Sequence, residues 1–470
     1  MDLAETLGQL KASGWKSVLV KDEIRRNAIA RIQADEPLFD GVLGYENTVA
    51  PQLENALLAG HDVVFLGERG QAKTRMIRSC INLLDEYMPI IEGSEINDDP
   101  LTPVSRYAKD LVAEEGDDTR ISWVHRSQRF AEKLATPDTS IADLIGEVDP
   151  IKVAEGRYLS DELTLHYGMV PRSNRGLFAI NELPDLAERI QVGLLNVLEE
   201  RDVQIRGYRI QLPLDVMLFA SANPEDYTNR GRIITPLKDR FGTQIRTHYP
   251  LEIDTEIDIV EQEAQVFSAE GIDVSVPDFM AEIIATMSHL ARDNPHINQR
   301  SGVSVRLSIA NYETLVASAV RRTLRQGGTK AVPRVADLTA LTPSTMGKIE
   351  IESMDDGRDA EIIEHLLSAA TMVTFKEALD HDDVRGVLDA FEESEAVVQT
   401  GDDIADAQYL EMVSSMPALA QALTALGYAP DDLSDASLVA SGVEFVLEGL
   451  HLSKRLNKEA LGASAVYRSR

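Results

Sequence analysis

The sequence has few of the features that characterise secreted or membrane proteins. Its 470 residues include a single cysteine, Cys80, so no intrachain disulfide can form, and this fits a reducing compartment. Aromatic residues make up only 5% of the chain, and no window approaches the roughly 18–20 apolar residues that span a bilayer. Residues 1–27 carry acidic side chains early and lack an unbroken apolar run, which argues against a secretory signal. We therefore expect a cytoplasmic protein with no membrane span.

Basic residues are also scarce. The chain has 46 Lys and Arg against 78 Asp and Glu, which gives a net charge of −32 and a pI near 4.6. Because that field repels polyanions, duplex DNA is not an expected ligand. Hydrophobic residues make up 44% of the chain, which together with the low aromatic content is typical of a helix-rich α/β protein. At roughly 100–200 residues per domain, the length predicts two to four domains.

Short apolar runs alternate with helical segments between residues 41 and 250. The clearest runs are DVVFLG (62–67), GLFAI (176–180) and VMLFA (216–220). Runs of this kind are typical of parallel strands that are covered by helices on both faces. We therefore expect an α/β domain at residues 41–250.

Three other regions flank this domain. Residues 1–40 are expected to form short helices that lead into it. From about residue 251 the apolar residues recur at helical spacing, which predicts a separate helical domain at 251–350. Residues 351–470 keep that spacing but are rich in Asp and Glu. We expect them to form a third, α-helical domain with an acidic surface.

Two segments interrupt the α/β domain. Residues 93–135 are polar and too long for a simple connection, so we expect an insertion with small elements of its own. In residues 201–213, Val203 and Ile205 alternate with polar residues ahead of Gly207-Tyr208. This pattern predicts a β-hairpin with its turn at Gly207-Tyr208.

Residues 67–74 follow a predicted buried strand and precede a helix, which is the context of a P-loop. Backbone N–H groups of such a loop wrap phosphates, Lys73 would place positive charge on the β and γ oxygens, and the Thr74 hydroxyl would ligate Mg²⁺. The usual glycine before the lysine is Ala72 here, and its methyl group is tolerated if φ is negative. The predicted nucleotide-binding residues of the loop are Gly67, Glu68, Arg69, Gly70, Gln71, Ala72, Lys73 and Thr74.

Two further apolar strands end in polar residues that suit ATP chemistry. The run 176–180 is followed by Asn181 and Glu182, where a P-loop ATPase places one carboxylate at the metal's water shell and a second that polarises the attacking water. Glu182 suits the second role, whereas the Asn181 amide, acting through water, would help Mg²⁺ less. The run that starts at residue 216 ends in Asn223, whose amide could hold the attacking water, although Asn-Pro is also a common turn.

The order of these motifs resembles one family. The chain is similar to AAA+ ATPases of the helix-2-insert group, in particular the magnesium chelatase I subunit and MoxR-type ATPases, over about residues 38–310. The similarity is carried by GVLGYENTV, the P-loop, IGEVDPIKVAEG, SNRGLFAINEL, LLNVLEERDVQIRG, SANPED, LKDRFG and SGVSVR, in that order.

The resemblance implies a fold and a cofactor. The fold is α/β: a P-loop AAA+ core with a parallel sheet, then an α-helical lid at 251–350, then the acidic α-helical domain at 351–470. Within the core, residues of about 150–175 would be the helix-2 insert and those of about 201–213 the pre-sensor hairpin. The cofactors would be ATP and Mg²⁺, with the metal at Thr74 and, through water, at Asn181.

The resemblance also assigns roles outside the P-loop. Glu182 would be the catalytic glutamate, Asn223 sensor 1, Arg240 an arginine finger that reaches a neighbouring subunit, and Arg306 sensor 2. Three residues would border the adenine: Val42, Leu43 and Gly44. An arginine finger implies a homo-oligomeric ring, expected to be a hexamer, and relatives of this kind pair with a von Willebrand A domain protein.

The predicted function is therefore a ring-forming ATPase that remodels a protein client or assists metal insertion. Asn181 departs from the family pattern and leaves open a nucleotide-dependent scaffold that hydrolyses ATP weakly. A σ54-type activator ranks lower, because no GAFTGA-like sequence occurs in residues 93–175. An MCM-like helicase also ranks lower, because the net charge is −32 and the predicted hairpin is poor in basic residues.

Overall fold

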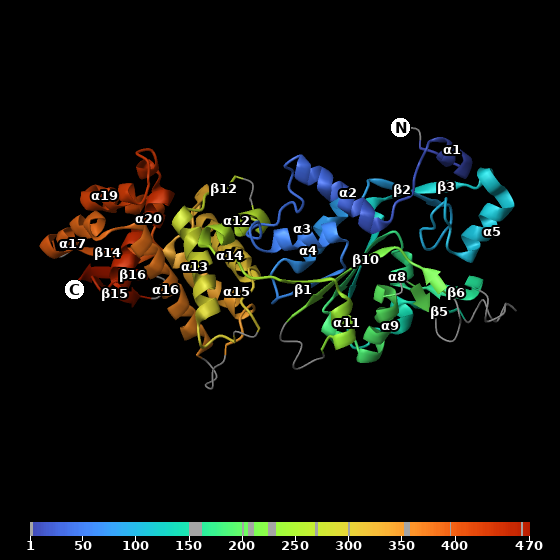
Figure 1. The fold of residues 1–470 in the computed structure, drawn as a ribbon. Coiled ribbons are helices and arrows are strands. Elements are labelled where there is room, and N and C mark those ends of the chain that lie inside the picture. The colour runs from blue at the N-terminus through green and yellow to red at the C-terminus, as the bar shows by residue number, and fades with distance from the viewer. Residues whose placement is uncertain are drawn as a thin grey trace. The chain divides into compact units, whose positions relative to one another are not determined.

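The computed structural model divides the chain into two compact units, Met1–His248 and Tyr249–Arg470, which are drawn in Figure 1. The structure describes these residues: 3–149, 162–199, 202–204, 211–223, 232–267, 271–298, 301–351, 358–394, 396–461 and 464–470. The boundary between the units lies close to residue 250, where the strand-like runs of the sequence stop.

The first unit is built on a five-stranded sheet in which every neighbouring pair is parallel. Its order is β11 (Thr243–Arg246), β1 (Val63–Leu66), β10 (Val216–Ala222), β7 (Gly176–Asn181) and β4 (Phe130–Leu134). The predicted α/β fold with a parallel sheet is confirmed. Ligands of such sheets bind at the carboxyl ends of the strands, and here those ends carry the P-loop, Glu182 and Asn223.

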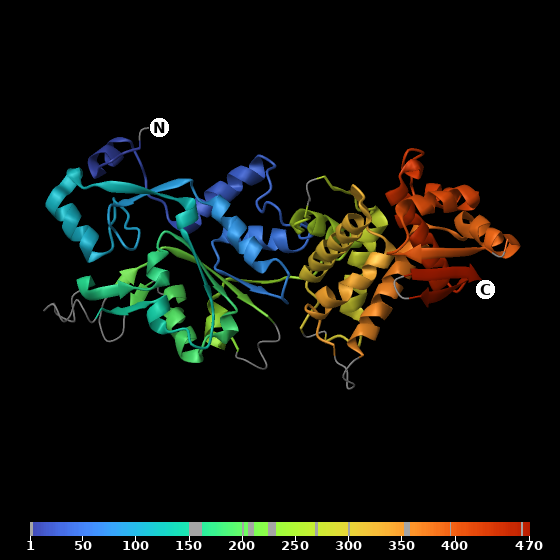
Figure 2. The same cartoon turned by 180° about the vertical axis from the view of Figure 1, so that it is seen from behind.

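Helices cover both faces of this sheet (Figures 1 and 2). Side chains of alternate strand residues pack against one helix layer or the other, because successive residues of a strand point to opposite faces. One layer holds α2 (Val20–Gln33), α3 (Val49–Ala59) and α4 (Lys73–Ser79). The opposite layer holds α6 (Ile141–Leu144), α8 (Met169–Arg172), α9 (Glu188–Glu199) and α11 (Thr235–Arg240).

Residues 93–135 are not wholly an insertion, so that prediction needs correction. They do contain small elements, namely α5 (Arg106–Glu115) and β3 (Ile121–His125), and β3 pairs with β2 (Tyr87–Ile91). Residues 130–134, however, are the edge strand β4 of the main sheet. This strand was not predicted because it lies at the edge of the sheet and is half exposed. Its sequence, FAEKL, therefore contains charged residues that a buried strand lacks.

The N-terminal residues form α1 (Leu7–Ala12) and α2, as expected for a helical lead-in. They are nevertheless part of the first unit rather than a separate piece. Val20, Ile24 and Ala28 of α2 are buried in the same apolar cluster as strands β1, β7 and β10.

Two antiparallel strand pairs of the core lie in the described residues. β8 (Asp202–Gln204) pairs antiparallel with β9 (Gln211–Pro213), as the sequence predicted, and β5 (Gly146–Val148) pairs with β6 (Leu165–Tyr167). The predicted turn at Gly207-Tyr208 and residues 150–161 of the helix-2 insert lie outside the described residues.

The second unit begins with the helices that the sequence predicted as a lid. They are α12 (Ile253–Glu263), α13 (Asp278–Asp293), α14 (Arg306–Gln326) and α15 (Thr342–Met346), with a small parallel pair, β12 (Asp273–Val274) and β13 (Lys330–Ala331). The chain continues through α16 (Asp359–Ala378), α17 (His381–Ser394), α18 (Asp406–Ser415), α19 (Pro417–Ala425) and α20 (Ala436–Leu452).

Two expectations for the C-terminal region were wrong. First, residues 251–350 and 351–470 are not separate domains, because their buried apolar side chains form one cluster. Second, the C-terminal part is not purely helical: β14 (Val397–Gly401), β16 (Ser464–Ser469) and β15 (Leu456–Leu461) form an antiparallel sheet. These strands mix polar and apolar residues over only five or six positions, which is too short for a clear sequence pattern.

None of the helices in the described parts of the chain is long and apolar enough to cross a membrane.

Candidate functional site

The loop between β1 and α4 is tightly anchored at its first glycine. The Gly67 N–H donates to the Ala222 carbonyl of β10 at 3.1 Å. A Cβ atom at residue 67 would collide with the side chains of Thr247 and Gln71, so only glycine fits. Gly70 has φ of +75°, a left-handed conformation that glycine adopts without cost. These two glycines give the loop the curvature that the sequence predicted.

Ala72 adopts a conformation opposite to the one expected. We expected negative φ at this residue, but its φ is +49° and its ψ is +17°, in the left-handed region. This conformation costs an L-residue roughly 1–2 kcal/mol. The family's glycine at this position avoids that strain, and the loop of this protein retains it.

Gln71 fastens the loop to its surroundings. Its buried side-chain oxygen accepts hydrogen bonds from the Glu68 N–H at 2.9 Å and from the Thr247 hydroxyl at 2.7 Å. The Tyr45 hydroxyl donates to the Gln71 carbonyl at 2.9 Å and also contacts the His248 carbonyl at 2.8 Å. Burial raises the pKa of Tyr45 to about 12, so this phenol stays protonated and remains a donor.

The residues predicted to border the adenine are next to Tyr45 in the chain. Val42, Leu43 and Gly44 directly precede it and are each half-buried. Because Tyr45 is bonded to the P-loop, these three residues lie beside the loop rather than elsewhere on the unit. The anchoring roles of Tyr45 and Gln71 were not predicted from the sequence; the aromatic residue in GVLGYENTV is the one signal there for Tyr45.

Lys73, Asn223 and Glu182 form one hydrogen-bonded line across the carboxyl ends of three strands. The Lys73 ammonium donates to the Asn223 side-chain oxygen at 2.9 Å, to the Glu68 carbonyl at 2.7 Å and to the Gly67 carbonyl. The Asn223 amide in turn donates to the Glu182 carboxylate at 3.0 Å. Lys73 and Asn223 are buried, whereas Glu182 is half-buried. The structure thus brings together three residues that are up to 150 positions apart in the sequence.

Glu182 is held in a left-handed conformation, with φ of +55°. Its N–H donates weakly to the Ser221 hydroxyl at 3.4 Å. A non-glycine residue in this region persists only where its surroundings fix it, and such residues cluster at functional sites. The strained backbone of Glu182 is therefore an independent sign that the end of β7 is a functional position.

Asn181 lies beside two polar side chains from the flanking strands. The Ser221 hydroxyl donates to the Asn181 side-chain oxygen at 3.1 Å, and the Asn181 amide nitrogen donates to the carboxylate of Glu132 on β4. Glu132 also forms an ion pair with Arg78 of α4 at 2.8 Å. The sequence analysis did not single out Ser221, Glu132 or Arg78, because nothing in their local pattern marks them.

Several curated proteins that are similar to this chain are magnesium-chelatase ChlI subunits. Magnesium-chelatase subunit ChlI of Mesostigma viride is 23% identical over 358 residues, which are 72% of this chain and 95% of that protein. The ChlI subunit of Nostoc sp. is 26% identical over 236 residues, which are 48% of this chain and 58% of that protein. This chain has an α/β P-loop fold and resembles the magnesium chelatase I subunit. No protein-family model matches it.

The extent of the similarity differs between relatives. The aligned part of this chain spans 46% of the chloroplastic ChlI-1 subunit of Arabidopsis thaliana, at 25% identity. Among solved structures, a chain of the BchI–BchD complex of magnesium chelatase matches 68% of this chain and 97% of its own length, at 20% identity with a TM-score of 0.36. That score is too low to support an argument about function.

A pocket of about 370 Å³ borders the P-loop. Its walls include Gly67 and Glu68 of the loop and three residues that the sequence analysis did not select: Lys238, Arg246 and Thr247. Lys238 and Arg246 add two positive charges next to the place where the predicted phosphates would lie. Such a charge pattern suits an anionic ligand.

Neither of the two predicted arginines is among the residues that line this pocket. Arg240 ends α11, and its guanidinium donates to the Pro236 carbonyl at 2.9 Å. Lys238 lines the pocket from the same helix, but residues two apart point to different sides of a helix. Arg306 is the first residue of α14 in the second unit and is exposed. Their roles stay predictions.

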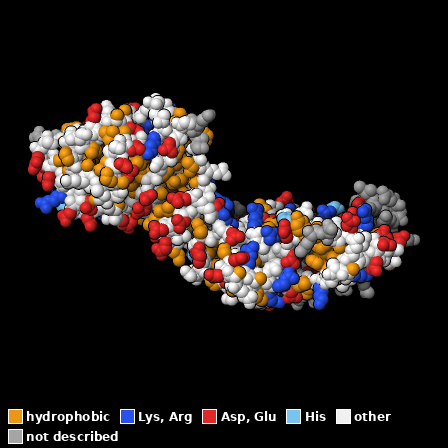
Figure 3. Space-filling view, turned by 90° about the horizontal axis from the view of Figure 1, so that it is seen from above, with side chains coloured by type: hydrophobic (Ala, Val, Ile, Leu, Met, Phe, Trp, Pro, Cys, Tyr) orange, Lys and Arg blue, Asp and Glu red, His pale blue; other side chains and the backbone are white. Residues whose placement is uncertain are grey.

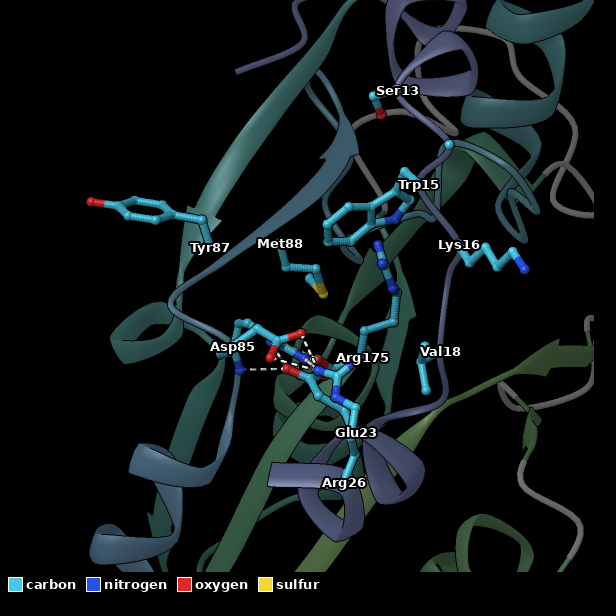
Figure 4. Close-up of a pocket in the computed structure, with 12 residues that line it drawn as sticks. Ser13, Trp15, Lys16, Val18, Glu23, Arg26, Asp85, Tyr87, Met88 and Arg175 are labelled. Carbon is cyan, nitrogen blue, oxygen red and sulfur yellow. Dashed lines mark hydrogen bonds and ion pairs between the residues drawn. The ribbon is translucent and has the colours of Figure 1, made fainter. Parts of the chain in front are cut away.

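A second cavity of the first unit, of about 390 Å³, lies at the N-terminal segment and is lined by Trp15, Arg26 and Asp85 among others (Figure 4). Beside it, Arg129 donates to both carboxylate oxygens of Glu23 at 2.6 and 2.7 Å, and this pair is buried. The charged groups of this cavity thus largely bond to one another. We interpret the cavity as part of the attachment of α2 to the sheet.

Proposed function

We propose that this protein binds ATP with Mg²⁺ and hydrolyses the nucleotide. The observation that carries the proposal is the line of hydrogen bonds from Lys73 through Asn223 to Glu182 at the carboxyl edge of the sheet. One buried cation, one amide and one carboxylate on rigid strands are the set of groups that positions phosphate and water for transfer.

Lys73 would bind the phosphates. In the structure its ammonium is satisfied by two carbonyls of its own loop and by Asn223. Phosphate oxygens are stronger, charged acceptors than carbonyls, so Lys73 can exchange these partners for the nucleotide. Lys238 and Arg246 would supply further positive charge from the pocket wall.

Glu182 would act as the general base that accepts a proton from the attacking water. Its carboxylate is held by the Asn223 amide at 3.0 Å, and its backbone is fixed at the end of β7. Asn223 thereby touches both the phosphate-binding lysine and the base. This contact lets it position the water between them, as the prediction of a sensor at residue 223 requires.

The oxygen atoms at this edge fit Mg²⁺, which prefers hard oxygen ligands and retains several waters. Thr74 follows Lys73 on α4, and Asn181 follows the apolar part of β7. These residues would hold the ion together with the nucleotide. The ion would neutralise charge that develops on the β and γ phosphate oxygens.

We further propose that the protein works as a homo-oligomeric ring, expected to be a hexamer, on a protein client. Arg240 would act as an arginine finger in a neighbouring subunit's site, because it ends α11 without lining the pocket of its own P-loop. Assistance in metal insertion, and a von Willebrand A domain partner, rest on the resemblance to the chelatase and MoxR proteins alone.

Steady-state phosphate release tests the enzymatic part of this proposal. We expect Glu182→Gln to bind ATP as wild type does but to release phosphate at least about 100-fold more slowly, since a general base contributes roughly 10²–10⁴-fold. Glu188→Gln on α9 is a suitable control, because it removes the same charge from an exposed side chain outside the proposed site. Equal rates for wild type and Glu182→Gln would exclude Glu182 as the base.

A nucleotide-dependent scaffold with weak hydrolysis is the second candidate function. Asn181 favours it, because an amide stabilises a cation less than a carboxylate does. This alternative predicts tight ATP binding together with a phosphate release rate that does not change in Glu182→Gln.

A further inference from the structure

The metal edge of the proposed ATP site has a carboxylate that sequence patterns did not reveal. We propose that Glu132 on β4 supplies the negative charge that an aspartate at residue 181 would otherwise supply to the nucleotide-bound Mg²⁺. This inference rests on the proposed ATP-binding function and adds a specific residue to it. Three observations place Glu132 at this edge.

The first observation is the contact between Glu132 and Asn181. β4 and β7 are parallel neighbours in which Glu132 pairs with Ala179 and Leu134 with Asn181. From this position the Glu132 carboxylate reaches the Asn181 amide nitrogen and accepts its hydrogen bond. The residue that departs from the family pattern is therefore bonded directly to a carboxylate on the next strand.

The second observation is the face of the sheet that these side chains occupy. Phe130 of β4 and Leu177 and Ala179 of β7 pack in the apolar cluster on the α4 side of the sheet. Because side chains alternate along a strand, Glu132 and Asn181 lie on that same side. Helix α4 packs on this side, and Thr74, the predicted metal ligand, is its second residue.

The third observation is the contact between Glu132 and helix α4. Arg78 donates to the Glu132 carboxylate at 2.9 Å through Nε, and a second guanidinium nitrogen lies 2.8 Å from the same oxygen. Thr74 and Arg78 are four residues apart, so they share one face of α4. Glu132 is thus bonded both to the strand that carries Asn181 and to the helix face that carries Thr74. It therefore contacts one predicted metal-holding residue, Asn181, and the helix that carries the other, Thr74.

These contacts also explain why residue 181 is an amide. The Asn181 oxygen accepts from the Ser221 hydroxyl, and its nitrogen donates to Glu132. An aspartate at residue 181 would place two carboxylates in contact, which disfavours the ionised state of both. The sequence left open whether Asn181→Asp would raise the hydrolysis rate; with Glu132 adjacent, we expect no gain from that single change.

Nucleotide affinity measured with and without Mg²⁺ tests the role of Glu132 without relying on catalysis. We would titrate the full chain with N-methylanthraniloyl-ATP, once with excess Mg²⁺ and once with EDTA. The quantity of interest is the ratio of the two dissociation constants. Glu132→Gln keeps the size of the side chain but removes its charge and one of its two hydrogen-bond acceptors, and Glu147→Gln on β5 is the matched control at an exposed position.

The expected result is specific to the charge. Glu132→Gln should reduce the Mg²⁺-dependent gain in affinity by about tenfold or more, which is the typical effect of losing a residue that supports a metal site. Its affinity in EDTA should stay close to that of wild type. Glu147→Gln should resemble wild type in both buffers. The double variant Glu132→Gln/Asn181→Asp exchanges the carboxylate and the amide, and it should recover most of the gain. Recovery would show that this pair of residues needs one carboxylate, whichever of the two strands carries it.

Three results would overturn the inference, and they can be told apart. An unchanged ratio in Glu132→Gln, with normal binding by wild type, would exclude Glu132 alone and leave the ATP site intact. A reduced ratio that the double variant does not recover would show that Glu132 only supports the strand and Arg78. Wild-type protein that binds no nucleotide in either buffer would overturn both this inference and the proposed function.

Discussion

Two residues of the candidate site carry backbone strain. Ala72 and Glu182 have φ of +49° and +55°, a region that non-glycine residues rarely occupy. Each such residue costs of order 1–3 kcal/mol and persists only when its surroundings fix it. At Ala72 the surroundings are the anchored P-loop and the first turn of α4, and at Glu182 they are the end of β7.

The strain at Ala72 can be measured. We expect Ala72→Gly to raise the free energy of unfolding by up to about 1 kcal/mol. Removing the left-handed strain stabilises the folded state by roughly 1–2 kcal/mol, and the greater conformational entropy of glycine in the unfolded chain offsets part of this gain. ATP binding should be retained. Urea denaturation monitored by circular dichroism is the measurement.

Ala113→Gly provides the control, because Ala113 lies exposed within α5. There the same substitution should lower stability by about 0.5–1 kcal/mol. Destabilisation of similar size at both positions would mean that Ala72 is not strained.

At the scale of single residues, the sequence predicted the groups proposed to act on ATP but not the side chains that hold them in place. Lys73, Glu182 and Asn223 were predicted, since each follows an apolar strand whose carboxyl end must lie at one edge of the sheet. Glu132 and the anchoring role of Gln71 could not be predicted. Their roles depend on which strands are neighbours and on side-chain contacts across more than 40 residues, which no local pattern encodes.

At the scale of elements, helix α2 depends on side chains from the sheet. Its cap residue Leu19 provides no side-chain hydrogen bond, and instead the Val20 N–H donates to the Asp215 carboxylate at 2.8 Å. Burial raises the pKa of Asp215 to about 6, although the Val20 N–H and the nearby Arg175 oppose that rise. Glu23 on the same helix forms the buried pair with Arg129.

Asp215 makes stability depend on pH in a predictable direction. Its pKa is about 6 in the folded protein against an ordinary 3.8, so between these values the folded state holds a proton that the unfolded chain has released. The stability from this group is therefore present below about pH 4 and is lost as pH rises through 6, by roughly 3 kcal/mol in all.

Asp215→Asn should remove this dependence. The difference in unfolding free energy between the variant and wild type should grow in the variant's favour by roughly 2–3 kcal/mol between pH 4 and pH 7. Urea titrations at several pH values provide the measurement, with Asp22→Asn in the exposed Asp22–Arg25 pair as the control. Parallel stability curves for wild type and Asp215→Asn would contradict the account.

The sequence predicted the central elements better than the peripheral ones. Strands β1, β7 and β10 are central and covered on both faces, so their apolar runs were unmistakable. Strand β4 and the three C-terminal strands are short, exposed on at least one side or charged, and they were missed. Their existence depends on pairing partners that are distant in the chain.

On the scale of the whole molecule, the protein carries a strong excess of negative charge. The net charge is −32, and residues 401–450 contain no Lys or Arg. In Figure 3, Asp and Glu side chains are scattered over the visible face, and no broad basic field covers it. This distribution favours a protein client over a polyanion.

The proposed ring can be tested by mixing two inactive variants. We expect Arg240→Ala to bind ATP normally but to lose roughly 10³-fold or more in phosphate release, as is typical for an arginine finger. If Arg240 acts on a neighbouring subunit, mixing this variant with Glu182→Gln should restore activity, because some sites then combine an intact Glu182 with an intact Arg240.

Gel filtration with ATP and Mg²⁺ should show oligomers under the same conditions. A mixture that stays inactive although mixed oligomers form would contradict action between subunits. A strict monomer would contradict the ring itself.

The most direct test of the central claim is equilibrium binding of N-methylanthraniloyl-ATP to wild type and to Lys73→Ala, with circular dichroism to verify that both are folded. Lys73 is the buried cation to which Asn223 and, through it, Glu182 are bonded. If the loop at residues 67–74 holds the phosphates, wild type binds the nucleotide and Lys73→Ala loses at least about tenfold in affinity, as expected when a charge-assisted contact worth about 1.5–3 kcal/mol is removed. Equal affinity in the two proteins, or no binding by wild type, would contradict the account.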